Sequence, residues 1–229
     1  MGKFIVVVDY GLGNLRSVAK ALELAGAKVK VTNKLSEIDS SCAVVLPGVG
    51  AFKRAMENLN ELDLTGALLQ TIKTGKPFLG VCLGLQLLFT ESEEHGLYRG
   101  LDVIRGKVKK IAPGVKVPHM GWNNIKIVGA GPCLCPKGAP ARDKKSVGTD
   151  PDVRSQSLFT GIPDESYFYF VHSYYVEPRD KSVIEAVTEY GQEFVSAVHK
   201  DNVWGVQFHP EKSAELGLRV LRNFVSVCG

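Results

Sequence analysis

Three apolar runs that each end in a glycine-bearing turn constrain the fold of this chain more than any other feature. The runs KFIVVVD, CAVVL and PFLGVC lead into the turns YGLGN, PGVGAF and GVCLGLQ. Continuous apolar runs of this length are typical of strands buried on both faces of a sheet. Because apolar residues at helical spacing follow each turn, the first half predicts repeated βα units and a mainly parallel sheet with helices on both faces.

Helices are expected between these strands. The spacing predicts them from Leu15 to Ala25, from Phe52 onwards, from Leu64 to Ile72 and from Leu83 to Glu91. In such sheets the ligand binds beyond the carboxyl ends of the strands. The three glycine turns therefore mark one candidate site.

The second half is richer in strand-like alternation, and its Asp201-Asn202 pair predicts a hairpin turn. An amphipathic helix is expected from Ala214 to Val227, and an irregular loop insertion at about 129–157, where prolines and glycines occur without periodicity. We expect one α/β domain over residues 1–229, with additional antiparallel strands in its C-terminal half.

Composition excludes several classes of protein. The 229 residues are 45% hydrophobic with a net charge of +4, which gives no case for nucleic-acid binding. The first run predicts a strand and not a signal peptide, and no apolar run approaches the ~18 residues of a membrane span. Five scattered cysteines favour a reducing, cytoplasmic setting. Cys133 and Cys135 lack a companion ligand pair of zinc-site spacing, so we expect neither a metal nor a cofactor.

The segment GVCLG, from Gly80 to Gly84, places a cysteine between two glycines after a strand and before a helix. This pattern is typical of a nucleophile elbow, in which a tight turn lifts the central side chain above the sheet. The alternative is that Cys82 is a small apolar filler of the core. The flanking glycines leave these two interpretations evenly balanced.

A cysteine nucleophile needs a base, and the base needs a group that orients it. His209 ends an apolar strand in VQFHPEKS, and Pro210 breaks that strand, so His209 and Glu211 can point the same way. Of the other histidines, His95 is expected to be solvated and His199 structural. His119 and His172 are expected at polar edges of the fold, as binding residues.

Acyl transfer also needs donors aimed at the developing oxyanion. The backbone N–H of Leu83 is one candidate, and the turn PGVG from Pro47 to Gly50 can supply another. The turn YGLGN lacks the third glycine of a dinucleotide fingerprint, because Arg16 stands there. We interpret it as a tight strand–helix turn.

Dispersed motifs carry a family resemblance. PGVGAF, GVCLGLQLLF and FHPEKS, in this order, resemble class I glutamine amidotransferases, which hydrolyse glutamine through Cys, His and Glu. DYGLGNLRSV, LPGVGAF, PHMGWN and FVHSYYVEP are similar to the glutaminase subunits of imidazole glycerol phosphate synthases. The resemblance covers nearly the whole chain and lapses across residues 129–157. It implies a flavodoxin-like three-layer sandwich.

The resemblance also implies roles for individual residues. Cys82 would attack the side-chain carboxamide of glutamine, His209 would transfer protons, and Glu211 would orient His209. Gly50 and Leu83 would bind the oxyanion. The residues that would hold the amino-acid end of the substrate are Gln86, Val171, His172, Ser173 and Tyr174.

A partner is implied as well. In this family ammonia passes to a separate cyclase subunit, a (β/α)₈ barrel, which makes imidazole glycerol phosphate in histidine biosynthesis. The residues whose motifs would face that cyclase in a heterodimer are Asn14, Met120, Trp122, Asn123 and Lys212. The mild positive charge, including Arg105 and Lys107, is compatible with an acidic docking face.

Three alternatives stay open at this point. The chain could serve another amidotransferase, in pyridoxal phosphate, purine or anthranilate synthesis. It could be a cysteine hydrolase of related fold that cleaves peptides alone. It could also be a docking subunit without activity, although the full set of Cys82, His209 and Glu211 speaks against that.

Overall fold

The computed structural model of the protein describes residues 3–128 and 157–228. The expected loop insertion at about 129–157, with Cys133 and Cys135, lies outside the described residues except for Ser157. The helices are α1 (Leu15–Leu24), α2 (Leu35–Ser40), α3 (Phe52–Glu61), α4 (Leu64–Lys73), α5 (Leu83–Leu87) and α6 (Ala214–Ser226), with short 3₁₀ turns η2 (Lys181–Val183) and η3 (Pro210–Lys212). The strands are β1 (Ile5–Val8), β2 (Val29–Thr32), β3 (Ala43–Gly48), β4 (Phe78–Cys82), β5 (Phe89–Ser92), β6 (Tyr98–Arg99), β7 (Ile104–Lys110), β8 (His119–Asn124), β9 (Lys126–Ile127), β10 (Tyr167–His172), β11 (Tyr174–Pro178), β12 (Ile184–Glu189), β13 (Glu193–Lys200) and β14 (Val203–Val206).

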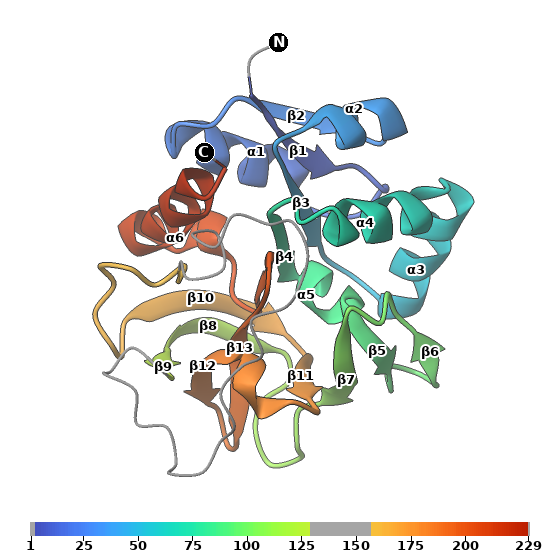
Figure 1. Cartoon of the computed structure of the whole chain (residues 1–229). Coiled ribbons are helices and arrows are strands. Elements are labelled where there is room, and N and C mark those ends of the chain that lie inside the picture. The colour runs from blue at the N-terminus through green and yellow to red at the C-terminus, as the bar shows by residue number, and fades with distance from the viewer. Residues whose placement is uncertain (1–2, 129–156, 229) are drawn as a thin grey trace, which may run out of the picture.

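Within these residues a 12-stranded sheet runs in the order β2-β1-β3-β4-β14-β13-β11-β7-β5-β6, with β12 and β9 attached beside β13. The first five strands of this order pair in parallel. The next three pairings are antiparallel. The fold is therefore the expected α/β sandwich, with a parallel centre built mostly from the first half and antiparallel strands added by the second (Figure 1).

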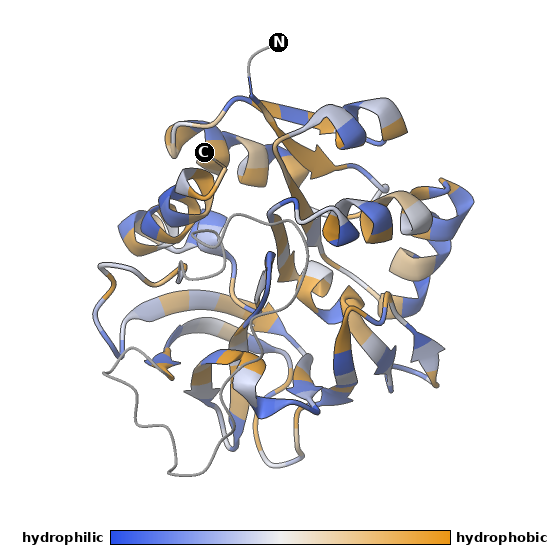
Figure 2. Cartoon of the chain, viewed as in Figure 1, coloured by the Kyte–Doolittle hydropathy of each residue, from blue (hydrophilic) through white to orange (hydrophobic). Residues whose placement is uncertain are grey.

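Two apolar clusters, one on each face of the sheet, form the core. Val6 and Val8 of β1 belong to the cluster packed under α2, α3, α4 and α5. Ile5 and Val7 belong to the other, which includes α1, α6 and β10. This alternation follows from the pleat, because successive side chains of a strand point to opposite faces. Since both faces are covered, β1, β3 and β4 have to be apolar throughout, and Figure 2 shows apolar central strands beneath helices of mixed hydropathy.

A two-stranded antiparallel ribbon of β8 and β10 lies on the α6 side of the sheet (Figure 1). Phe168 and Phe170 of β10 pack into the second cluster, whereas the neighbouring Tyr167 is exposed. The ribbon ends at His119 and His172, which pair across it. It therefore brings the segment that starts at Val171 next to the carboxyl ends of the parallel strands.

The hairpin expected at Asp201-Asn202 is confirmed, because β13 and β14 pair across this turn. The C-terminal amphipathic helix is also confirmed, as α6. None of the helices in the described ranges is both long and apolar enough to span a membrane.

The expected helix from Leu83 to Glu91 is wrong in its second half. The helix α5 ends at Leu87, and β5 begins at Phe89. The carbonyls of Leu87 and Leu88 accept hydrogen bonds from Leu101, Val103 and Ile104 instead of from the next helical turn. Pairing with a distant segment outweighs the local helical spacing, which is a tertiary effect that propensity alone does not contain.

Two glycines allow α5 to lie directly against the sheet. A Cβ on Gly84 would collide with the carbonyl oxygen of Leu46 in β3. A Cβ on Gly80 would lie 2.7 Å from the carbonyl oxygen of Gly84. Both obstacles are backbone atoms, which cannot move aside as a flexible side chain can. The close approach fixes where the residue between β4 and α5 is held.

We predict that Gly84→Ala lowers the free energy of unfolding by about 2 kcal/mol or more, because overpacking against backbone forces the helix away from the sheet. Gly66→Ala is the matched control, since Gly66 is also helical and an added Cβ there meets nothing within 4 Å. That change should stabilise by about 0.5 kcal/mol through helix propensity. Urea unfolding of both variants measures the difference, and equal effects would contradict this account.

Candidate active site

Cys82 is the last residue of β4 and directly precedes α5. Its backbone adopts φ 54° and ψ −107°, a conformation that costs a non-glycine residue energy. The parallel register places Gly48 of β3 beside Cys82, and on the other side Val206 of β14 beside Val81. The strand–turn–helix elbow is therefore present, and the residue that follows β14, Gln207, comes next to the cysteine.

A cavity of about 260 Å³ opens at this elbow. Most of its wall comes from the turn after β3, the start of α5, and the segment that joins β10 to β11, and one residue each is added after β5 and before β8. The lining residues are Val49, Gly50, Cys82, Leu83, Gln86, Glu94, Pro118, Val171, His172, Ser173 and Tyr174. Every residue that the sequence proposed for the oxyanion and the substrate is among them.

His209 and Glu211 form a buried pair beside this cavity. His209 Nδ1 lies 2.8 Å from Glu211 Oε1, and the two side chains are 3% and 2% exposed. The 3₁₀ turn η3 begins at Pro210 and brings the carboxylate back onto the ring, as the sequence predicts. The carbonyl of His209 accepts a hydrogen bond from the Ser213 hydroxyl at 2.7 Å. Both the ring and the backbone of His209 are thus held in place.

The electrostatics of His209 favour its protonated form. Burial alone would lower its pKa, but interactions with the Cys82 thiol and the Glu211 carboxylate outweigh burial and raise the pKa of His209 to about 10. Nε2 has no hydrogen-bond partner of regular geometry among the described residues. Since Nδ1 is engaged with Glu211, Nε2 is the nitrogen free to exchange a proton with Cys82 or with a bound substrate.

The turn PGVG lies against the elbow, as expected for an oxyanion site. The Tyr10 hydroxyl donates to the carbonyl of Pro47 at 2.8 Å and anchors the turn. Gly50 has φ +100° and open space at its Cβ position, so glycine is needed there for backbone conformation and not for room. A flexible residue at this point leaves its N–H able to turn towards the cavity, close to the start of α5.

Gln86 lies in the first helical turn after Cys82. Its Nε2 donates to the carbonyl of Tyr174 at 3.0 Å and to Gln207 Oε1 at 3.2 Å. These two bonds use both hydrogens of the amide group. A substrate contact by Gln86 can therefore use only its oxygen, Oε1.

The expectation that His119 and His172 lie at polar edges is wrong. Both side chains are buried, and His119 stacks on Tyr190 and on Phe170. Burial lowers the pKa of His119 to about 4. Burial, together with the neighbouring charges of His119 and His209, lowers the pKa of His172 to about 3. Both rings are therefore neutral. They are buried because they lie at the inner end of the ribbon β8–β10.

The hydrogen bonds of these two histidines determine their tautomers. His172 Nδ1 faces the carbonyl of Tyr174 at 2.9 Å, so Nδ1 carries the proton and Nε2 is an acceptor. His119 Nδ1, 2.9 Å from His172 Nε2, must then be the donor. That leaves His119 Nε2 to accept from Asn123 Nδ2 at 3.3 Å. The chain of bonds leads from β8 to the wall of the cavity.

The residues expected to face a partner are mostly on the surface. Met120 and Trp122 of β8 are 62% and 53% exposed. Asn14 is exposed, and the Lys212 ammonium lies over the Tyr169 ring at 5.7 Å. Asn123 differs, because its side chain bonds inwards to His119 and to the carbonyl of Glu189. Asn123 therefore connects strand β8 to the buried His119 and to the carbonyl of Glu189.

His95 and His199 are placed as expected. His95 is exposed in a turn, and His199 stacks on Trp204 with ring centroids 4.6 Å apart. Among the described residues, no group of three or more His, Cys, Asp or Glu side chains is placed to hold a metal ion.

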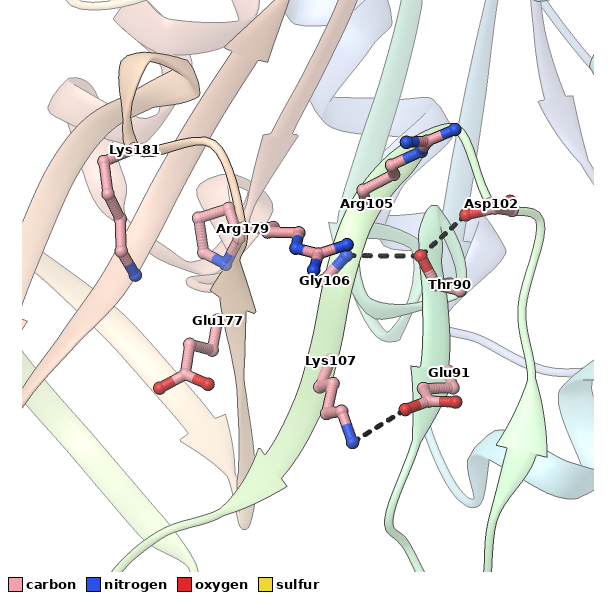
Figure 3. Close-up of a pocket in the computed structure, with 10 residues that line it drawn as sticks. Thr90, Glu91, Asp102, Arg105, Gly106, Lys107, Glu177, Arg179 and Lys181 are labelled. Carbon is pink, nitrogen blue, oxygen red and sulfur yellow. Dashed lines mark hydrogen bonds and ion pairs between the residues drawn. The ribbon is translucent and has the colours of Figure 1, made fainter.

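A larger hollow of about 680 Å³ lies elsewhere, between the ends of β5, β7 and β11 (Figure 3). Among the described residues, its lining contains neither cysteine nor histidine. Much of its charge is compensated internally, since Lys107 Nζ lies 2.8 Å from Glu91 Oε1. Lys109, further along β7, pairs with Glu177 at 2.8 Å. Two basic residues of β7 are therefore paired within the chain, and the docking of an acidic partner on this strand stays a prediction.

Comparison with protein families agrees with this geometry. The family model "Glutamine amidotransferase class-I" matches residues 6–228. The chain belongs to this family.

Curated relatives of this amidotransferase are similar to it over nearly their full length. The "Imidazole glycerol phosphate synthase subunit HisH" of Moorella thermoacetica is 46% identical over 96% of this chain and 93% of its own. The protein of the same name from Aquifex aeolicus is 45% identical over 96% and 94%. That from Methanothermobacter thermautotrophicus is 48% identical over 97% and 98%.

Solved structures support the fold. One crystal structure of a glutamine amidotransferase has a TM-score of 0.66 at 18% identity and covers 98% of this chain and 98% of its own. The PurLQS structure from Thermotoga maritima has a TM-score of 0.65 at 18% identity and covers 99% of each chain. These similarities concern the class I amidotransferase fold alone.

Sequence reasoning missed several residues of this amidotransferase site. Gln207 contacts the Cys82 sulfur through Nε2 at 3.6 Å, and Tyr10 anchors the PGVG turn. Glu94 lines the cavity and accepts a hydrogen bond from the Phe52 N–H at 2.6 Å. A polar amide inside the apolar run VWGVQF was the one available signal for Gln207. Nothing local distinguishes Glu94 from its charged neighbours.

We predict that Glu211→Gln lowers the pKa of His209 by at least one unit from about 10, because the carboxylate charge is lost while the packing is kept. Because the pKa of His209 is higher in the folded protein than its ordinary value of 6.5, protonated His209 stabilises the fold. This stabilisation is complete below pH 6.5 and is lost as the pH rises through about 10. Titration of the imidazole by NMR measures the shift. Glu215→Gln, an exposed carboxylate on α6 paired with Arg222, is the control and should leave His209 unchanged.

We also predict an acid sensitivity that arises from the buried neutral histidines. Their pKa values of about 4 and 3 lie below the ordinary 6.5, so the unfolded chain binds protons first as the pH falls. Each should cost up to about 1.4 kcal/mol of stability per pH unit below pH 6.5 until its own pKa in the fold is reached. Urea unfolding between pH 7 and 5 should show a shallower pH slope for His119→Gln. The control His95→Gln should keep the original slope, and identical slopes in all three proteins would contradict this prediction.

Proposed function

We propose that this chain is the glutaminase subunit of an imidazole glycerol phosphate synthase, acting in histidine biosynthesis in the cytoplasm. It hydrolyses L-glutamine to glutamate and ammonia and passes the ammonia to a separate cyclase subunit. The observation that carries the proposal is the buried His209–Glu211 pair beside Cys82 at a cavity of about 260 Å³. Relatives 45–48% identical over nearly the whole chain bear that name.

The first half of the reaction is acylation. The Cys82 sulfur attacks the carbon of the glutamine side-chain carboxamide, and negative charge develops on the carboxamide oxygen. The N–H groups of Leu83 and Gly50, two residues that line the cavity, would donate to that oxygen. His209, held protonated by Glu211, gives its proton to the leaving nitrogen. Ammonia departs and a γ-glutamyl thioester is left on Cys82.

The second half is hydrolysis of the thioester. Neutral His209 now takes a proton from a water molecule, which attacks the thioester carbon. The tetrahedral intermediate collapses with Cys82 as the leaving group, and His209 ends in its protonated form opposite the thiolate. Glutamate is released. Apart from the water that is consumed, these steps use only groups of the chain: Cys82 is the nucleophile of the first half, and His209 transfers protons in both halves.

The substrate fits the shape of the site. The cavity of about 260 Å³ has room for an amino acid, and Val171, Ser173 and Tyr174 line one wall of it. Polar backbone groups suit the charged amino-acid end of glutamine. The carboxamide would then extend to Cys82. His172 is held as a neutral ring and shapes the wall without bringing a charge.

A second subunit follows from the chemistry of ammonia. In neutral water ammonia is mostly ammonium, which is not a nucleophile, so a direct passage to the acceptor is needed. The exposed residues Met120 and Trp122 of β8, together with the exposed Asn14 and Lys212, would contact a (β/α)₈-barrel cyclase. The chain would form a heterodimer as one domain of 1–229. Its acceptor would be the phosphorylated ribulosyl intermediate of the pathway, which yields imidazole glycerol phosphate and the carboxamide by-product AICAR.

We predict that Cys82→Ala abolishes glutamine-dependent product formation by the reconstituted complex, by about 10³-fold or more, because no nucleophile remains. Product formation from added ammonium salt should be retained, since the cyclase and the interface are untouched. Both rates are measured by following the imidazole product with purified cyclase present.

Cys42→Ala is the matched control for this experiment. Cys42 is a half-buried thiol at the start of β3, bonded to the carbonyl of Phe4 at 3.1 Å, and it should be dispensable. Glutaminase activity is also measured alone, with the cyclase, and with the cyclase plus its substrate. Unchanged glutamine use by Cys82→Ala would refute the mechanism. Activity only with a partner from pyridoxal phosphate, purine or anthranilate synthesis would refute the assignment.

A further inference from the structure

The side chain of Gln207 lies between the nucleophile and Gln86. Gln207 follows β14 directly and is 0% exposed. Its backbone N–H donates to the carbonyl of Ser196 at 2.9 Å. Its Nε2 lies 3.6 Å from Cys82 Sγ and its Oε1 lies 3.2 Å from Gln86 Nε2. No role in the reaction proposed above uses this residue.

The orientation of the Gln207 amide follows from its neighbours. The carbonyl of Tyr174 can only accept, so Gln86 must present its Nε2 to it. The same Nε2 reaches Gln207, and the Gln207 atom that meets it must therefore be the acceptor Oε1. The opposite assignment would set two NH₂ groups against each other. Gln207 is left with its N–H donors pointing at the sulfur.

The starting point of this chain of bonds is rigid. Tyr174 is the first residue of β11 and pairs with Lys110 of β7 in the large sheet. Its carbonyl also accepts from His172 Nδ1 at 2.9 Å. The adjacent carbonyl of Ser173 is bonded to the Ile111 N–H at 3.0 Å. A backbone atom fixed in this way holds Gln86, and Gln86 holds Gln207.

We infer that Gln207 is a further catalytic residue of this enzyme, which donates an N–H hydrogen bond to the Cys82 sulfur and stabilises its thiolate form. Gln86 is the positioning residue that keeps the amide in the donor orientation. A thiolate is a far better acceptor than a thiol or a thioester sulfur, and the bond is strongest where water is excluded. The donor therefore favours the attacking thiolate and its return as a leaving group. Because the amide is uncharged, Gln207 does not compete with protonated His209 as the positive partner of the thiolate.

This role in turnover rests on the proposed glutaminase function, but the effect on the thiol does not. The test is the rate at which iodoacetamide alkylates Cys82 in the full chain between pH 5 and 10, quantified by mass spectrometry on the peptide that contains Cys82. Gln207→Met keeps the length of the side chain and removes the N–H donors. We expect the midpoint of the pH–rate profile to move about one unit towards higher pH, as for the loss of one hydrogen bond to a charged group.

Gln207→Leu is a second variant without a donor and serves if the methionine variant is poorly folded. It should show the same shift. Gln70→Leu is the matched control, because Gln70 is an exposed amide on α4, and its profile should match that of the wild type. Profiles of both Gln207 variants that coincide with the wild type, in folded protein, would overturn the inference.

Turnover with the cyclase separates this inference from the proposed function. Gln207→Met should lower kcat/KM for glutamine about tenfold and leave KM within about twofold, since the sulfur and not the substrate loses a partner. A shifted alkylation profile without glutamine turnover by the wild type would uphold the hydrogen bond and refute the proposed function. Normal glutamine turnover by the wild type, with an alkylation profile that Gln207→Met does not shift, would uphold the proposed function and refute the hydrogen bond.

Discussion

The close approach of α5 to the sheet, at Gly80 and Gly84, is the contact on which the site depends. With no Cβ on either residue, the first turn of the helix rests on the backbone of β3 and β4. The chain must then reverse within one residue, and Cys82 takes the strained conformation at φ 54°. A larger residue at either glycine would meet backbone atoms and would require the helix to move. Cys82 reaches the cavity wall because Gly80 and Gly84 leave room for this turn.

The rest of the site is built from strand ends that this arrangement brings together. Parallel pairing places the PGVG turn on one side of Cys82 and the segment from Gln207 to Glu211 on the other. The ribbon β8–β10 closes the third side. Burying an imidazole and a carboxylate is costly unless each has a partner. Here the partners are one another and Cys82, so the interaction that keeps His209 protonated also holds these residues together.

The sequence predicts those parts of the structure whose signals are local. The buried strands follow from continuous apolar runs, the elbow from Gly80 and Gly84, and the His209–Glu211 pair from the strand break at Pro210. The helix predicted to Glu91 failed because the carbonyls of Leu87 and Leu88 pair with residues that lie beyond Gly100. The burial of His119 could not be predicted from the local sequence either, since it depends on the pairing of β8 with the distant strand β10. The proximity of Gln207 to Cys82 follows from the register of β14 and β4, which the local sequence does not determine.

The polar groups around Cys82 form two series of hydrogen bonds that start at the Tyr174 carbonyl. From the Tyr174 carbonyl one branch runs through Gln86 and Gln207 to the sulfur. The other runs through His172 and His119 to Asn123 on the ribbon. Each member has one donor arrangement that leaves no bond in its branch unsatisfied, and protonation of either histidine would break it. The pKa values of these groups have different causes. Burial keeps the rings of His119 and His172 neutral, with pKa values of about 4 and 3, whereas at His209 the interactions with Cys82 and Glu211 outweigh burial and raise the pKa to about 10.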